Sequence, residues 1–227
     1  MGILYWIVTY GCKLGLRIAY KVDAAEMKKI RRSGPLILFT NHRGTVEAPM
    51  VYTHLQPRPK VTALSKVENW DKPFLGFVFN LWKIIPIRRG EVDLEAMRTL
   101  LDSLKDGWIL GIAPEGTRNR TGELIQAQAG IAVLAQKSGA PLQPLAHWVD
   151  KPARRFLGFF PRPVFHIRVG EPFRLAPSKG RVSKDDRQEI ADQIMYQLAR
   201  LLPEKMRGVY ASPSEAPHSK LVFEAEK

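Results

Sequence analysis

The chain has 227 residues, of which 45% are hydrophobic and 25% charged, and its formal net charge is +13 at pH 7. This length is typical of one domain with a sizeable core, and the hydrophobic content excludes an intrinsically disordered chain. Residues 1–35 hold seven Lys or Arg against two acidic residues, and residues 151–187 hold ten against three, so these segments carry nearly all of the charge. Such an excess favours an anionic partner, either a nucleic acid or a phospholipid surface.

The N-terminal segment is apolar but contains basic residues. Residues 2–20 are rich in aromatic and aliphatic side chains, yet Lys13 and Arg17 interrupt them short of the ~18 uninterrupted apolar residues of a membrane span. We therefore expect no transmembrane helix, and no secretory signal either, because the first ten residues carry no basic side chain. Residues 1–33 are predicted to form an amphipathic, basic segment, which either lies in a membrane interface or packs on its own domain. The single Cys12 cannot form an intramolecular disulfide, which fits a reducing compartment.

Short apolar runs alternate with helical periods after the turn at residues 33–35. Strands are predicted at residues 36–41, 61–65, 84–88, 107–114, 141–149 and 164–170, and helices at residues 92–107, 125–139 and 185–202. This alternation predicts an α/β fold, a single domain over residues 34–207 with a mixed sheet flanked by helices. The tail, residues 208–227, is polar and without periodicity, which predicts disorder.

The stretch "NHRGTVE" (residues 41–47) places a histidine and a glutamate directly after the first predicted strand. On an ideal helix, positions five apart lie about 140° apart, so His42 and Glu47 would not share a face. They can meet if His42 lies in the turn and Glu47 in the first turn of a helix capped by Thr45. A carboxylate bonded to one ring nitrogen would orient the imidazole and leave the other nitrogen to take a proton from a hydroxyl. A polar surface turn is the competing interpretation.

Arginines lie at or soon after the ends of two further predicted strands. "PEGTRNRTGE" (114–123) begins at the end of the strand at 107–114, and "IPIRRGE" (85–91) overlaps the one at 84–88. Arginine presents a planar fork of donors suited to phosphate oxygens, although arginines at strand ends are also common on a solvated face. Because strand ends at one edge of an α/β sheet gather in one crevice, the co-occurrence of the three motifs favours a site.

These motifs resemble those of the glycerolipid acyltransferases typified by 1-acylglycerol-3-phosphate acyltransferase. The family's Asn-His, four residues, Asp pattern is matched by Asn41, His42 and Glu47, with Glu in place of the usual Asp. Its second motif ends a strand on an arginine, matched by Arg88, and its third, Pro-Glu-Gly-Thr-Arg, is intact at residues 114–118. Order and spacing agree over roughly residues 34–150, including an apolar strand that bears Pro141 and Pro144 as candidates for the fourth motif.

The resemblance implies roles for individual residues. His42 is the expected general base and Glu47 the residue that orients it. The expected substrate-binding residues are Asn41, Arg88, Glu115, Gly116, Thr117 and Arg118, with Arg88 and Arg118 holding the phosphate of the acceptor. Neither a metal nor a cofactor is expected, since acyl-CoA or acyl carrier protein (acyl-ACP) enters as a co-substrate.

The function implied is transfer of a fatty acyl group to the hydroxyl of a lysophospholipid, with 1-acylglycerol-3-phosphate as the expected acceptor, in phospholipid biosynthesis. Another lysolipid or glycerol phosphate as acceptor, and a catalytically weak membrane-bound relative, are the alternatives. A nucleic-acid-binding protein would also explain the charge, but the sequence shows no motif with basic and stacking residues at a meaningful spacing, so no nucleic-acid partner is expected.

A monotopic protein on the cytoplasmic face of an anionic membrane follows from the same resemblance. Two segments are predicted to anchor it, residues 2–20 and the basic-aromatic run "KPARRFLGFFPRPVF" (151–165). In that run the predicted inserting residues are Phe156, Leu157, Phe159 and Phe160, and the predicted phosphate-pairing residues are Arg154, Arg155 and Arg162. A surface loop leading into the next strand is the competing interpretation of residues 151–165.

Overall fold

The computed structural model describes residues 2–58, 60–88, 93–119, 121–150, 162–177, 183–214 and 216–223. The helices are α1 (Ile3–Ala19), α2 (Glu47–Leu55), α3 (Pro73–Leu81), α4 (Leu94–Lys105), α5 (Gly130–Ser138) and α6 (Lys184–Ala199). Short 3-10 turns are η1 (Ala25–Lys29), η2 (Val67–Asn69), η3 (Glu204–Met206) and η4 (Gly208–Tyr210). The strands are β1 (Lys21–Asp23), β2 (Leu36–Thr40), β3 (Val61–Lys66), β4 (Ile85–Ile87), β5 (Ile109–Ile112), β6 (Leu142–Asp150), β7 (Val164–Val169), β8 (Phe173–Leu175) and β9 (Leu221–Phe223).

The strands form one mixed sheet in the order β1-β7-β6-β2-β5-β3-β4, with β8 paired to β6 and β9 to β8. The five strands β6, β2, β5, β3 and β4 are mutually parallel, whereas β7 and β8 run antiparallel to β6. The predicted α/β fold with a mixed sheet flanked by helices is therefore confirmed. Parallel pairing brings the carboxyl ends of all five strands to the same edge of the sheet.

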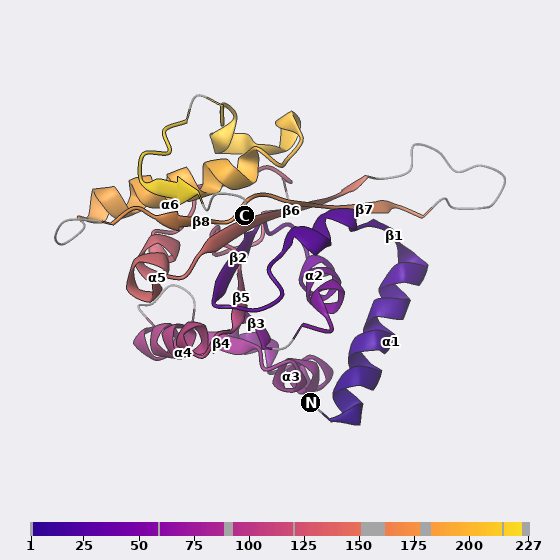
Figure 1. Cartoon of the computed structure of the whole chain (residues 1–227). Helices are drawn as coiled ribbons and strands as arrows, with labels where there is room; N and C mark the ends of the chain where they lie inside the picture. Colours follow the sequence, from indigo (N-terminus) through magenta and orange to yellow (C-terminus); the bar gives the residue numbers. More distant parts are fainter. Residues whose placement is uncertain are drawn as a thin grey trace.

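Alternating side chains of β2 divide the core into two layers. Ile37 and Phe39 pack in one cluster with residues of α4, α5 and α6, and Leu36 and Leu38 pack in another with residues of α1, α2 and α3. All four side chains are buried. A strand buried on both faces reads as a continuous apolar run, which is why "LILF" shows no polar alternation. Figure 1 shows the two groups of helices on opposite faces of the sheet.

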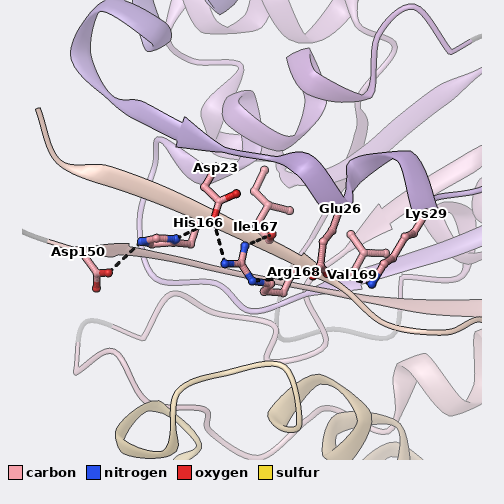
Figure 2. A network of polar contacts seen from close by, with 8 residues as sticks. All are labelled: Asp23, Glu26, Lys29, Asp150, His166, Ile167, Arg168 and Val169. Atoms are coloured by element: carbon pink, nitrogen blue, oxygen red, sulfur yellow. Dashed lines mark hydrogen bonds and ion pairs between the residues drawn. The ribbon is translucent and has the colours of Figure 1, made fainter.

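Ion pairs and hydrogen bonds of charged side chains connect β1 to the neighbouring strands of the sheet (Figure 2). The guanidinium of Arg168 on β7 donates to Oδ2 of Asp23 at 2.8 Å, and this hydrogen bond and that of His166 lower the pKa of Asp23. The ring of His166 bridges two strands, with Nδ1 3.2 Å from Asp23 Oδ2 and Nε2 2.9 Å from Asp150 Oδ2 on β6. The sequence did not indicate β1 as a strand, because it is three residues long and lacks an apolar run.

The C-terminal residues correct one prediction. Residues 208–214 and 216–223, which were expected to be disordered, form η4 and β9. Tyr210 is 2% exposed, donates its hydroxyl to Asp192 Oδ1 at 2.7 Å and accepts from the Ala127 N–H at 3.0 Å. β9 pairs with β8. Burial of a few apolar side chains orders this segment, and a polar composition does not reveal such contacts.

Other boundaries differ from the predictions in detail. Helix α5 begins at Gly130, five residues later than predicted, and α3, β1 and β8 were not predicted. Most of the basic-aromatic run at 151–165 lies outside the described residues. In its described part, Arg162 donates to the carbonyl oxygen of Arg17 at 2.7 Å, at the C-terminal end of α1.

Replacing Tyr210 by phenylalanine removes one hydroxyl and leaves the Ala127 N–H and the Asp192 carboxylate without this partner. We expect Tyr210→Phe to lower the free energy of unfolding by about 1–3 kcal/mol, measured by urea denaturation. The matched control is Tyr196→Phe, because Tyr196 packs against Tyr210 with ring centroids 5.0 Å apart and its hydroxyl has no hydrogen bond within the described ranges. Equal stability of the Tyr210 variant and wild type would contradict the ordering role of this residue.

Candidate active site

Strand register places three predicted site residues in one row. Phe39 pairs with Ile112, Ala63 with Gly111, and Lys66 with Ile87, so His42, Glu115 and Arg88 follow their strands at the same level. Because β4 lies three strands from β2 and neighbouring strands are ~4.8 Å apart, the backbones at Arg88 and His42 are separated by roughly 14 Å. His42 and Arg88 therefore lie at the two ends of the row, with Glu115 next to His42.

His42 and Glu47 meet as predicted. Nδ1 of His42 lies 3.5 Å from Oε2 of Glu47, and the two side chains are 20% and 12% exposed. The same Oε2 accepts the backbone N–H groups of Arg43 at 2.9 Å and Gly44 at 2.8 Å. One carboxylate oxygen thus folds the turn and faces the imidazole, which leaves Nε2 of His42 as the ring nitrogen for a substrate.

The surroundings of Glu47 favour its ionised form. Burial alone would raise its pKa, but the hydrogen bonds from the His42 ring and from the N–H groups of Gly44 and Arg43 outweigh burial and lower the pKa to about 2. A permanently charged carboxylate next to an imidazole stabilises the protonated ring. The pair is arranged for a histidine that takes up a proton.

The helix start near Glu47 corrects the expected cap. Helix α2 begins at Glu47 with Val46 in the N-cap position, and no side chain caps it. Thr45 is exposed and makes no capping hydrogen bond. The Glu47 side chain instead reaches back to the N–H groups of the preceding turn, as a glutamate in the first turn of a helix can.

Glu115 is a buried carboxyl group that accepts hydrogen bonds from two backbone N–H groups of the site. Its side chain accepts the His42 N–H on Oε1 at 2.8 Å and the Ile125 N–H on Oε2 at 3.3 Å, and the residue is 2% exposed. Burial raises its pKa to about 7, only partly offset by these hydrogen bonds, and the charge of Glu47 adds to the increase. Glu115 therefore ties the loop after β2 to the loop after β5.

Asn41 is held by a histidine that the sequence did not single out. The Asn41 side chain donates to the carbonyl oxygen of His147 at 2.9 Å and accepts the His147 N–H at 3.0 Å. Nε2 of His147 lies 2.8 Å from the carbonyl oxygen of Asn41, so this nitrogen carries the hydrogen. Burial lowers the pKa of His147, whose ring stacks on Phe165. A histidine within the apolar run at residues 144–149 of strand β6 was the only signal in the sequence.

The loop after β5 carries the rest of the third motif. Gly116 has φ +68°, a conformation that favours glycine, so this turn requires it. Thr117 and Arg118 are exposed, and the N–H of Asn119 donates to the carbonyl oxygen of His42 at 2.9 Å. The structure thus brings Glu47 and Glu115 into contact with His42, and it holds Asn41, the residue before His42, against His147. Thr117 and Arg118 stay at the solvent edge.

Arg88 also stays at the solvent edge, where it is exposed, and its N–H donates to Asp93 Oδ2 at 3.0 Å. In the part of the chain that the structure describes, no group of three or more His, Cys, Asp or Glu side chains lies close enough together to hold a metal ion.

A family model described as Acyltransferase matches residues 21–148, which contain every one of these site residues. The chain belongs to the Acyltransferase family. It is similar to the 1-acyl-sn-glycerol-3-phosphate acyltransferase of Bacillus subtilis strain 168, with 23% identity over 79% of this chain and 90% of that protein. It is 24% identical to the chloroplastic 1-acyl-sn-glycerol-3-phosphate acyltransferase BAT2 of Brassica napus over 56% of this chain. That match spans only 37% of the plant protein.

A solved member of this acyltransferase group has the same fold. The crystal structure of the 1-acyl-sn-glycerophosphate (LPA) acyltransferase PlsC from Thermotoga maritima superposes with a TM-score of 0.58 and 16% identity. The match covers 84% of this chain and 76% of that one. At this identity the comparison supports the fold, a mixed sheet with flanking helices and an N-terminal helix.

Glu47 and Glu115 of the candidate site make the free energy of unfolding depend on pH in opposite directions. The pKa of Glu115 rises from its usual 4.5 to about 7, so its contribution to stability is lost as the pH rises from about 4.5 through about 7. The loss approaches roughly 3 kcal/mol, since each pKa unit corresponds to 1.36 kcal/mol. Glu47 affects stability in a different pH range, because its stabilisation is present above pH about 4.5 and is lost only as the pH falls towards about 2.

Glu115→Gln should flatten the decline in unfolding free energy between pH 4.5 and 7, measured by urea denaturation at several pH values. The control is Glu123→Gln, an exposed carboxylate of the same loop, which should keep the wild-type slope. A slope in Glu115→Gln identical to that of wild type would show that Glu115 titrates alike in the folded and unfolded chains.

Proposed function

We propose that this protein transfers a fatty acyl group from acyl-CoA or acyl-ACP to the hydroxyl of a lysophospholipid, with 1-acylglycerol-3-phosphate as the acceptor. The observation that carries the proposal is the His42 and Glu47 pair at the carboxyl end of β2, with the imidazole partly exposed and its Nδ1 3.5 Å from a carboxylate. The names of the Bacillus and Thermotoga proteins support the same acceptor.

The reaction follows from the chemistry of that pair. Nε2 of His42 accepts the proton of the acceptor hydroxyl while the oxygen attacks the thioester carbonyl carbon. Glu47, whose low pKa keeps it ionised, stabilises the imidazolium. The tetrahedral oxyanion then collapses, the carbon–sulfur bond breaks, and the thiolate leaves and takes up the proton from His42. The products are an ester and a free thiol.

The acceptor phosphate is assigned to Arg88 and Arg118. Both side chains are exposed at the edge of the sheet that carries His42, and both follow strands parallel to β2. Guanidinium groups form charge-assisted hydrogen bonds with phosphate oxygens. Acylation of a different lysolipid or of glycerol phosphate would use the same groups, and a weakly active relative would retain the arginines without efficient turnover.

His42→Ala should lower kcat by at least ~100-fold, because a positioned general base contributes 10²–10⁴ to the rate. Glu47→Gln should also slow turnover, since the imidazolium loses its charged partner, whereas Glu47→Asp should keep appreciable activity. The measurement is mass spectrometry of the products formed from acyl-CoA with lysophosphatidate, other lysolipids and glycerol phosphate.

Circular dichroism should show that these variants stay folded. A wild-type rate of transfer in His42→Ala would remove His42 from the mechanism. A panel in which no acceptor is acylated by wild-type protein would overturn the proposed function itself.

We also propose that the protein works while bound to an anionic membrane surface. Helix α1 packs one face on the domain, where Tyr5 bonds the Tyr52 hydroxyl at 3.1 Å and Thr9 accepts from Trp82 at 2.9 Å. The apolar residues of its other face are exposed; they are Ile3, Leu4, Ile7, Tyr10, Leu14 and Ile18. Phe74 and Phe77 on α3 are exposed as well, and α3 lies beside the N-terminal end of α1 (Figure 1).

Exposed apolar side chains at helical spacing support interfacial binding, because burial of such a face in the head-group region removes it from water. Ile3 is 80% exposed and Phe74 79%, which a helix covered by its own domain would not show. Among the described residues, no helix is long and apolar enough to span a bilayer.

Ile7→Ser/Leu14→Ser should reduce sedimentation with anionic phospholipid vesicles, most clearly at high salt, where only apolar insertion remains. The matched control is Leu94→Ser/Val209→Ser, because both residues are 62% exposed, like Ile7 and Leu14, and lie outside α1 and α3. Equal sedimentation of the two double variants would exclude the α1 face as the anchor and leave the catalytic proposal intact.

A further inference from the structure

A small cavity lies against Arg43, the residue after His42, and against the end of β6. It has a volume of about 190 Å³ and is lined by Arg43, Thr121, Trp148, Val149, Asp150, Lys205 and Met206. This is below the ~300–1,000 Å³ of pockets that enclose a whole drug-sized ligand, so the cavity fits one chemical group of a larger molecule. Its lining comes from the turn after β2, the loop after β5, the end of β6 and η3.

The guanidinium of Arg43 is the unusual feature of this cavity. Arg43 follows the proposed base directly and is half-buried, yet its side chain makes no ion pair with the described residues. Its hydrogen bond there is from Nη1 to the thioether sulfur of Met206 at 4.0 Å, a weak acceptor. A partly desolvated cation without a strong acceptor fits an anion supplied by a ligand.

Other side chains of the lining agree with an anionic ligand. Lys205 adds a second cation and Thr121 a hydroxyl donor. Asp150 is the one acidic group in the lining, and its Oδ2 is 2.9 Å from Nε2 of His166, so its charge is shared with that ring (Figure 2). Gly122 leaves room for the arginine, because a Cβ there would overlap the Arg43 guanidinium.

The cavity and the Arg88 end of the site lie on opposite sides of His42. Strand β6, whose end lines the cavity, is the neighbour of β2 on one side, while β4 lies three strands away on the other. A single phosphate on a lysophospholipid reaches only one of these places. If the acceptor phosphate binds at Arg88, the cavity at Arg43 suits a phosphate of the acyl donor, whose thioester must also approach His42.

We propose that Arg43 and Lys205, with the Thr121 hydroxyl, form a phosphate-ester subsite distinct from the one at Arg88 and Arg118. The inference rests on the proposed acyl transfer for its occupant, since both acyl-CoA and acyl-ACP carry a phosphate ester on the pantetheine unit that bears the thioester. The acceptor phosphate has the same chemistry, so the experiment must separate the two sources.

The kinetic experiment compares Arg43→Gln and Lys205→Gln with wild type on matched substrates. The donor arm sets palmitoyl-CoA against palmitoyl-N-acetylcysteamine, which has the same thioester without phosphate. The acceptor arm sets lysophosphatidate against a monoacylglycerol. Loss of a charge-assisted hydrogen bond should raise the KM of the phosphate-bearing partner by roughly 10-fold or more. Lys137→Gln, an exposed lysine on α5, is the matched control.

A KM increase confined to palmitoyl-CoA supports the subsite with the donor as its source, and one confined to lysophosphatidate supports it with the acceptor as its source. Losses that are equal with and without phosphate, or no loss in either arm, would overturn the subsite. Circular dichroism melting identifies a variant that fails to fold, and Arg43→Lys, which keeps the charge, should recover part of the affinity.

Direct binding separates this inference from the proposed function. Calorimetric titration of the protein with coenzyme A, and with glycerol 3-phosphate, needs no turnover. Weaker binding of one probe in Arg43→Gln supports the subsite even if no acyl transfer is found. Unchanged binding of both probes in both variants overturns it while acyl transfer, read by product mass spectrometry, stands or falls separately.

Discussion

The register of the parallel strands is the constraint on which the site depends. Five strands pointing the same way must end at one edge, and the offset between β2 and β5 sets His42 opposite Glu115. A slip of one residue would turn Ile37 and Phe39 to the other face of the sheet, away from α4, α5 and α6. The apolar pattern that builds the core therefore also fixes where the polar loops meet.

Two glutamates of the same site are placed in opposite electrostatic states. Glu47 combines three donors on or near one carboxylate, which lower its pKa to about 2, whereas burial raises the pKa of Glu115 to about 7. One residue thus supplies a fixed negative charge for the imidazole, and the other supplies hydrogen-bond acceptors for two backbone loops. Burial raises the pKa of both carboxyl groups, so the difference lies in the donors and charges that face each one.

The apolar face of α1 and the polar edge of the sheet are consistent with a substrate that has both characters. A lysophospholipid presents a hydrocarbon chain and a charged head group, so an enzyme that uses it needs an apolar approach and a polar site. Helix α1 is held to the domain by the hydrogen bond between the Tyr5 and Tyr52 hydroxyls and by the one that Trp82 donates to Thr9, and these bonds fix the direction of its outer face. The proposed mechanism, in which two anionic substrates meet at one base, would use the cationic groups on both sides of His42.

The sequence alone determined the alternation of strands and helices, because buried strands such as "LILF" and the helical period of residues 92–107 are local patterns. It also indicated His42, Glu47 and the Pro-Glu-Gly-Thr-Arg motif, since polar residues directly after apolar runs stand out. It did not indicate the order in residues 208–214 and 216–223, where Tyr210 bonds Asp192 on α6. Nor did it indicate β1, a strand of three residues that pairs with β7 and carries the ion pairs of Asp23. Tertiary structure alone decided that Asn41 is held by His147 and that Arg43 faces a cavity beside Lys205, because those partners are more than 100 residues apart and only packing brings them together.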